Sequence, residues 1–109
     1  MKNLKRGDVV WVNLDPTVGA EIKKRRPCVI VSLSVLNDRR LTVVVVPLSG
    51  SSTTRPPLVV AVPSAGAEAN ARIDQIRAVD KSRVVGAIGK LINADMEAVA
   101  QGLRTVLGL

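Results

Sequence analysis

The sequence predicts a mainly β fold, a small SH3-like barrel that carries one C-terminal helix. Short runs of valine and isoleucine, separated by polar turns with glycine and proline, occupy the first four-fifths of the chain. The last fifth changes from strand-like to helical spacing of its apolar residues. The chain has 109 residues, a length that suits one hydrophobic core, so we expect residues 1–109 to form a single domain.

The apolar runs predict the strands in order. Residues 9–12 (Val-Val-Trp-Val) form a short β-branched run between Gly7 and the Asp15-Pro16 turn. The runs at 27–33 and 41–47 are almost continuously apolar, which indicates strands covered on both faces, as in a tight barrel. Further strands are expected at 58–62, at 72–79, where apolar Ile73 alternates with polar Asp74, and at 84–91, with loops at 17–26, 49–57 and 63–71.

Residues 93–107 predict the single helix. Asn93 is a favourable N-cap, and Asp95 and Glu97 place negative charge in the first turn, where the helix dipole favours it. We expect the helix to pack on the barrel through one apolar stripe. That stripe comprises Met96, Val99, Ala100, Leu103, Val106 and Leu107.

The charge balance predicts a polyanionic partner. Sixteen Lys and Arg against nine Asp and Glu give a formal charge of +7, for which nucleic acid is the leading partner. Phe and Tyr are absent and Trp11 is the only aromatic residue, which argues against a platform of stacked bases. No apolar run is long enough for a signal peptide or a membrane span, so we expect a cytoplasmic protein with no membrane partner.

Missing residue types exclude several chemistries. The chain has no histidine, which rules out a two-histidine ribonuclease and a His/Cys metal site, and we expect no metal or other cofactor. The one cysteine, Cys28, forms no internal disulfide and is expected in the core. Carboxylate, guanidinium, hydroxyl and amide groups remain available for catalysis.

These groups suffice to cleave RNA, because the substrate supplies its own nucleophile, the 2′-hydroxyl. The enzyme needs a general base and cations that neutralise the charge of the transition state. Glu21 and Asp74 both fit the role of base. The alternative for Glu21 is a solvated loop charge, and the alternative for Asp74 is a structural ion pair with Arg72 or Arg77.

Three ordered motifs resemble one known family. The first runs from Arg6 to Glu21 (Arg-Gly-Asp-Val-Val-Trp-Val-Asn-Leu-Asp-Pro-Thr-Val-Gly-Ala-Glu) and is followed by Arg26-Pro27. The second is Pro-Leu-Ser at 47–49, after the valines, and the third is Arg-Ile-Asp-Gln-Ile-Arg-Ala-Val-Asp at 72–80. Together they resemble the MazF/PemK (Kid-like) toxins of type II toxin–antitoxin systems, from about residue 6 to the C-terminal helix.

The resemblance implies a function and a set of partners. It implies a homodimer of SH3-like barrels with single-stranded RNA lying across the interface. It further implies sequence-specific, metal-independent endoribonuclease cleavage of mRNA, which leaves 2′,3′-cyclic phosphate and 5′-hydroxyl ends and arrests translation and growth. The implied protein partner is a MazE-like antitoxin whose acidic tail occupies the RNA groove, which suits a +7 surface.

The resemblance also assigns catalytic and binding residues. Arg26 matches the family's catalytic arginine and is expected to stabilise the charge of the transition state. Glu21 matches a loop glutamate as candidate base, Asp74 is the rival base, and Ser49 supplies a hydroxyl for the phosphate. Ala20 stands where some Kid-like members have histidine, which favours the arrangement of Glu21, Arg26 and Ser49. The residues expected to bind RNA are Lys23, Lys24, Arg25, Arg72, Gln75 and Arg77.

Two other functions are compatible with the same fold. Some toxins with this barrel poison DNA gyrase by binding it, without chemistry of their own. The other alternative is an inactive homologue that binds RNA in a salt-dependent way and releases no product.

Overall fold

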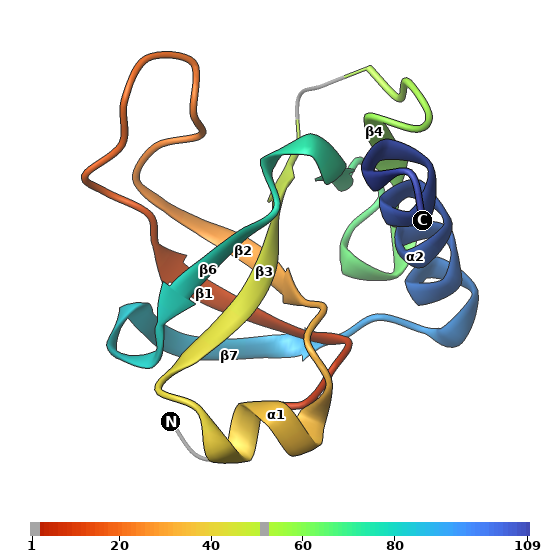
Figure 1. Cartoon of the computed structure of the whole chain (residues 1–109). Helices are drawn as coiled ribbons and strands as arrows, with labels where there is room; N and C mark the ends of the chain where they lie inside the picture. Colours follow the sequence, from red (N-terminus) through yellow and green to blue (C-terminus); the bar gives the residue numbers. More distant parts are fainter. Residues whose placement is uncertain (1–2, 51–52) are drawn as a thin grey trace.

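The computed structural model describes residues 3–50 and 53–109, so positions 51–52 of the predicted 49–57 loop lie outside the described residues. The fold is mainly antiparallel β-sheet with a long C-terminal helix, as the sequence predicts (Figure 1). The strands are β1 (Asp8–Asn13), β2 (Arg25–Ile30), β3 (Thr42–Ser49), β4 (Val59–Ala61), β5 (Asn70–Arg72), β6 (Arg77–Asp80) and β7 (Val84–Lys90). The helices are α1 (Ser34–Arg39) and α2 (Asn93–Leu107), with short 3-10 turns η1 (Pro63–Ala65), η2 (Ile73–Gln75) and η3 (Lys81–Arg83).

The sheet curls into an open barrel. Its strand order is β4-β5-β3-β2-β1-β7, and β6 pairs separately with β3. The first half of β3 pairs with β6 up to Val45, and its end pairs with β5 from Leu48 onward. Pro47 lies at this change of partner, where a strand tolerates a residue without an N–H. Because β4 and β7 stand at opposite ends of the order, the described strands do not close into a full cylinder.

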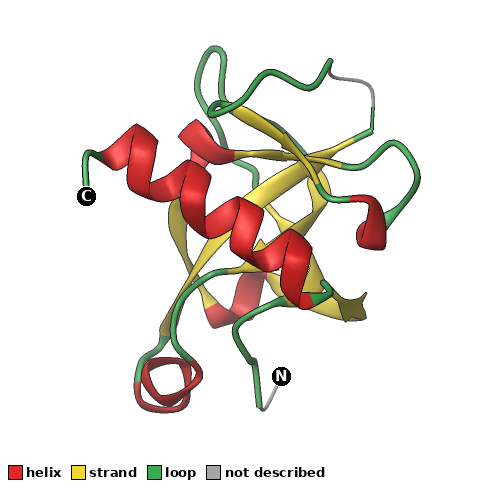
Figure 2. Cartoon of the chain, turned by 90° about the vertical axis from the view of Figure 1, so that its right-hand side faces the viewer, coloured by secondary structure: helices red, strands yellow, loops and turns green. Residues whose placement is uncertain are grey.

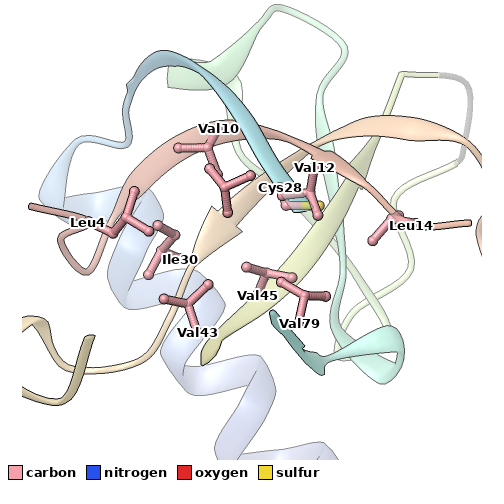
Figure 3. Packing of buried hydrophobic residues seen from close by; sticks show 10 residues of the cluster. Leu4, Val10, Val12, Leu14, Cys28, Ile30, Val43, Val45 and Val79 are labelled. Carbon is pink, nitrogen blue, oxygen red and sulfur yellow. The ribbon is translucent and has the colours of Figure 1, made fainter. Parts of the chain in front are cut away.

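The central strands are buried on both faces, as the continuous apolar runs predict. Along β3, Val43 and Val45 face one core, while Val46 and Leu48 face a second core under α2. Cys28 and Ile30 of β2 join the first core, which Figure 3 shows in close view. Successive side chains of a strand point to opposite faces, so a strand between two cores needs apolar residues throughout.

Most predicted strands are confirmed with small shifts of their ends, but β2 is displaced. It begins at Arg25 and ends at Ile30, whereas the sequence predicted 27–33. Antiparallel pairing with β1 extends through the arginines, because Val12 pairs with Arg26 and Asn13 with Arg25. Arg26 therefore lies in a strand and not in a loop, and the end of β3 likewise places Ser49 in a strand.

The prediction of one continuous strand at 72–79 is wrong, because only residues 72 and 77–79 lie in strands. β5 ends at Arg72, a 3-10 turn (η2) follows, and β6 begins at Arg77. Ile73 packs in the core under α2, whereas Val79 of β6 packs in the first core, so the two ends of this segment face different cores and one strand cannot serve both. The region 63–71, predicted as a loop, also contains η1 and the start of β5.

Helix α1 was not predicted, because only its tertiary contacts reveal a buried side. Asn37 is its one buried residue, at 2% exposure. Its Nδ2 donates to the carbonyls of Leu4 and Ser32, at 2.9 and 3.2 Å. The surrounding side chains Leu33, Val35 and Leu36 are at least half exposed. Helical periodicity is therefore weak in this segment.

Helix α2 has the predicted extent but not the predicted cap. The helix begins at Asn93, and the N-cap residue is Ile92, which makes no side-chain cap. Ser64 of η1 instead supports this end: its Oγ accepts from Ile92 N at 3.2 Å, and its N–H donates to Asp95 at 2.8 Å. Four residues of the predicted stripe (Met96, Val99, Leu103 and Val106) pack on the second core, Ala100 is buried, and Leu107 is half exposed. Figure 2 shows α2 lying across the strands. No helix within residues 3–50 and 53–109 is long and apolar enough to span a bilayer.

Candidate functional site

The first loop, between β1 and β2, is held in one shape by hydrogen bonds at its base. Lys24 has a left-handed backbone (φ 70°), an unusual conformation for a residue with a side chain. Its N–H donates to Asp15 Oδ1 at 3.0 Å, and its carbonyl accepts from Leu14 N at 3.0 Å. Arg83 donates to the carbonyls of Asn13 and Asp15. These contacts turn the chain directly into the arginines of β2.

Glu21 stabilises a turn at the tip of the same loop. Its Oε1 accepts from Val18 N at 2.6 Å, and its own N–H donates to Val18 O at 3.2 Å. The next residue, Ile22, packs on the first core and donates its N–H to Gln75 Oε1 at 2.7 Å. Gln75 thus ties the loop that carries Glu21 to η2, which lies 53 positions further along the chain.

A first pocket of about 350 Å³ lies between this loop and η2. It brings together four residues singled out from the sequence, namely Glu21, Asp74, Gln75 and Arg77. Arg77 also donates from Nη1 to Leu14 O at 3.3 Å. Within the part of the chain that the structure describes, no ion pair joins Asp74 to Arg72 or Arg77, so the structural ion pair considered for Asp74 is not present.

A second pocket of about 310 Å³ contains Arg26 and Ser49. The β2–β3 register pairs Cys28 with Pro47, and continuing it by two residues sets Arg26 opposite Ser49. Arg26 is half-buried, and its Nε donates to Lys23 O at 3.2 Å, which orients the guanidinium. Ser49 is 8% exposed. A guanidinium and a hydroxyl on facing strand ends suit the binding of a phosphate oxygen.

The structure therefore divides the predicted catalytic set between two neighbouring pockets. Pro47 lines the first pocket, and the next residue, Leu48, lines the second, so the end of β3 separates them. Neither candidate base, Glu21 or Asp74, lines the pocket of Arg26 and Ser49. A ligand that contacts all four side chains must cross the end of β3.

Positive charge surrounds both pockets. Lys23, Lys24 and Arg25 are exposed, whereas Arg72 and Arg77 are half-buried. The three exposed cations precede Arg26 directly, so they lie beside the second pocket and are available to a polyanion. Of the predicted RNA-binding residues, Gln75 and Arg77 line the first pocket. Lys23, Lys24 and Arg25 precede Arg26 on the first loop and β2, and Arg72 ends β5 without lining either pocket.

Cys28 belongs to the core, as predicted. Its side chain is fully buried, and burial raises the pKa of the thiol to about 12, while the positive charge of Arg77 acts in the opposite direction. Across residues 3–50 and 53–109, no three His, Cys, Asp or Glu side chains gather closely enough to hold a metal ion.

One acidic residue of the second pocket, Glu68, is not indicated by any sequence pattern. Glu68 lies between η1 and β5, in a segment of small residues predicted as a loop. It belongs to none of the three motifs, and only the tertiary structure places it in the pocket of Arg26 and Ser49.

Comparison with known proteins shows which family the chain belongs to. Residues 5–107 match the model for the PemK-like, MazF-like toxin of type II toxin–antitoxin systems. The chain belongs to this family. It is 28% identical over 119 residues to endoribonuclease MazF9 of Mycobacterium tuberculosis, an alignment that covers 97% of this chain and 98% of the relative.

Solved structures of similar chains agree with the fold. The crystal structure of MazF from Deinococcus radiodurans superposes with a TM-score of 0.86 at 24% identity, covering 96% of each chain. A mycobacterial endoribonuclease in complex with its cognate antitoxin superposes with a TM-score of 0.78 at 28% identity, covering 100% of this chain and 97% of the other. These likenesses confirm the predicted barrel type.

Proposed function

We propose that this toxin domain is a sequence-specific endoribonuclease that cleaves single-stranded mRNA without a metal ion. The observation that carries the proposal is the pairing of Arg26 and Ser49 in one pocket, beside exposed Lys23, Lys24 and Arg25. Similarity to a relative named as an endoribonuclease supports the same activity. The products are a 2′,3′-cyclic phosphate and a 5′-hydroxyl, since the neighbouring 2′-hydroxyl is the nucleophile.

In this mechanism Arg26 and Ser49 hold the scissile phosphate. The guanidinium donates to the phosphate oxygens and stabilises the additional negative charge of the transition state. The Ser49 hydroxyl donates a further hydrogen bond to a phosphate oxygen. The RNA backbone continues over the end of β3 toward the first pocket, where Gln75 and Arg77 bind the flanking nucleotides, and Arg72 at the end of β5 is a further contact for the backbone.

A carboxylate then removes the proton of the 2′-hydroxyl. Glu21 and Asp74 both line the first pocket and remain the two candidates for this base, so the ribose next to the scissile phosphate must lie at the end of β3, between the two pockets. The 2′-oxygen attacks phosphorus, the bond to the 5′-oxygen breaks, and the leaving 5′-oxygen takes a proton from water. Glu21 already accepts a hydrogen bond from Val18 N, so its carboxylate is held in place before RNA binds.

We also propose a homodimer and an antitoxin partner in the cytoplasm. Apolar side chains on the β1–β7 edge provide surface for a second copy: Trp11 is 40% exposed, and Val85 and Ile88 are each 46% exposed. The basic surface suits an antitoxin with an acidic tail that competes with RNA. A solved mycobacterial relative is described in complex with its cognate antitoxin, which supports this partner.

The test is cleavage of a long RNA in EDTA by wild-type protein and by two variants with equal charge change. Arg26→Ala should lower the cleavage rate about 10²–10³-fold, because it removes a donor to the transition state. Arg104→Ala, on the exposed face of α2, is the matched control and should cleave normally. Circular dichroism establishes that both variants are folded.

The product ends decide between the candidate functions. Discrete cuts with 5′-hydroxyl and cyclic-phosphate ends support the endoribonuclease. Intact RNA from folded, antitoxin-free protein would instead favour gyrase poisoning or RNA binding without chemistry. Near-normal cleavage by Arg26→Ala would remove Arg26 from the catalytic site.

A further inference from the structure

Glu68 is a carboxylate whose backbone is fixed beside the second pocket. A hydrogen bond from Ala69 N to Gly66 O, at 3.0 Å, closes a four-residue turn in which Glu68 is a central residue. The buried Asn70 side chain donates to Glu68 O at 3.3 Å and accepts from Thr54 Oγ1 at 2.9 Å. The backbone of Glu68 is therefore anchored on both sides, while its side chain is exposed.

The apolar walls beside Glu68 suit a flat, uncharged group, whereas Arg26 and Ser49 of the same pocket suit a phosphate. The walls of the second pocket are largely apolar. A further hollow of about 340 Å³ adjoins it and shares Gly50, Glu68 and Ala69 with it. Pockets with apolar walls and a few polar groups bind planar ligands in a chosen orientation. The apolar walls comprise Pro27, Leu48, Ala65 and Ala69.

The charge of Glu68 is unsuited to a phosphate. A carboxylate in the pocket of Arg26 repels a phosphodiester, and among the described residues no Lys or Arg forms an ion pair with Glu68. A carboxylate accepts hydrogen bonds from N–H donors. Guanine, cytosine and adenine each carry an exocyclic amino group that can donate, whereas uracil carries carbonyl oxygens in its place, and these two oxygens flank its N3–H and repel a carboxylate that approaches it.

We propose that Glu68 contacts a base next to the cleaved phosphate, accepts a hydrogen bond from its exocyclic amino group, and selects against uracil at that position. The base lies against the apolar walls while its phosphate is bound by Arg26 and Ser49. This inference rests on the proposed endoribonuclease function. Glu68 selects the substrate in this proposal, and other groups carry out the proton transfers of the reaction.

The experiment compares the base preference of wild-type protein, Glu68→Gln and the matched control Glu97→Gln. Glu97 is an exposed glutamate on α2 whose side chain is 71% accessible. Cleavage of a long RNA first gives the wild-type motif. Short RNAs then carry each of the four bases in turn at every position of that motif, and kcat/KM is measured for each.

We expect Glu68→Gln to reduce the preference for amino-bearing bases over uracil about tenfold at one motif position. A glutamine side chain presents both an acceptor and a donor, so it tolerates the uracil carbonyl oxygens. Cleavage at the best wild-type sites should continue in this variant. Glu97→Gln should keep the wild-type preference at all positions.

Three results would overturn the inference while leaving the proposed function intact. They are unchanged preference at every position in Glu68→Gln, a uniform rise in cleavage at all sites, and loss of cleavage at all sites in folded protein. The second would indicate simple electrostatic repulsion of RNA, and the third a catalytic role. Wild-type protein that cuts no RNA would instead overturn the proposed function, and this inference with it.

Discussion

The hydrogen bond between Gln75 and Ile22 should control how firmly the first loop is held over the first pocket. Gln75→Ala removes the acceptor that lies 2.7 Å from Ile22 N. A hydrogen bond of this kind contributes about 1 kcal/mol net, and this one is only part-buried, so water can replace the lost acceptor. A loss of about 1 kcal/mol corresponds to a roughly fivefold larger open population of the loop.

Hydrogen exchange at the Ile22 amide measures this opening directly. We expect exchange about fivefold faster in Gln75→Ala. RNA cleavage should also fall, since Gln75 is proposed to bind a flanking nucleotide and Glu21 is carried on the same loop. Gln75→Glu keeps an acceptor oxygen and should retain protection of the Ile22 amide. The cleavage rate of Gln75→Glu does not report on the loop, because the new carboxylate adds negative charge beside Asp74 and the RNA.

The reasoning would be refuted by unchanged exchange at Ile22 in Gln75→Ala. The loop would then be held by its base alone, through Lys24 and its partners Asp15 and Leu14. Equally faster hydrogen exchange at the Ile22 amide in Gln75→Ala and Gln75→Glu would show that packing of the Gln75 side-chain amide, and not its acceptor oxygen, holds the loop.

Two further predictions concern the core. In Gly102→Ala the new Cβ would lie 3.1 Å from Cγ1 of fully buried Ile73 and 3.3 Å from Pro57 O. The overpacking should cost about 1–3 kcal/mol, more than the gain of about 1 kcal/mol in helix propensity, so thermal unfolding should show a lower Tm. A raised Tm would contradict this prediction. The pKa of the Cys28 thiol rises from 9.0 in the unfolded chain to about 12 in the folded protein, so the unfolded chain releases this proton first as the pH rises. The free energy of unfolding should therefore fall above pH 9, by up to about 1.4 kcal/mol per pH unit. Denaturant titrations between pH 8 and 10.5 should show this slope in the wild type, and an equal slope in Cys28→Ala would disprove the assignment.

The sequence by itself determined the barrel and its central strands. Residues 43–46 are four consecutive valines, so both faces of the strand that contains them are apolar and neither suits contact with water. The strand therefore had to lie between two cores. The charge of +7 and the absence of histidine narrowed the chemistry to cations, carboxylates and hydroxyls. The ordered motifs around Arg26, Ser49 and Asp74 indicated the family, which the match over residues 5–107 confirmed.

Local periodicity was insufficient where tertiary contacts decide the structure. Residues 72–79 combine a strand end, a 3-10 turn and a new strand, because Ile73 must enter the core under α2 while β3 changes partner from β6 to β5. The start of α2 depends on Ser64, almost thirty residues earlier in the chain, and not on Asn93. Neither arrangement leaves a periodic signal in the sequence.

The distribution of the candidate site over two pockets was likewise decided only in three dimensions. The sequence supplied Glu21, Arg26, Ser49 and Asp74 as one catalytic set, but the end of β3 separates the two carboxylates from the arginine and the serine. Glu68 enters the arginine's pocket although it lies 42 positions away in the chain. The physical reason is that a motif fixes residue types along the chain, whereas strand register and the turns between strands fix which side chains share a pocket.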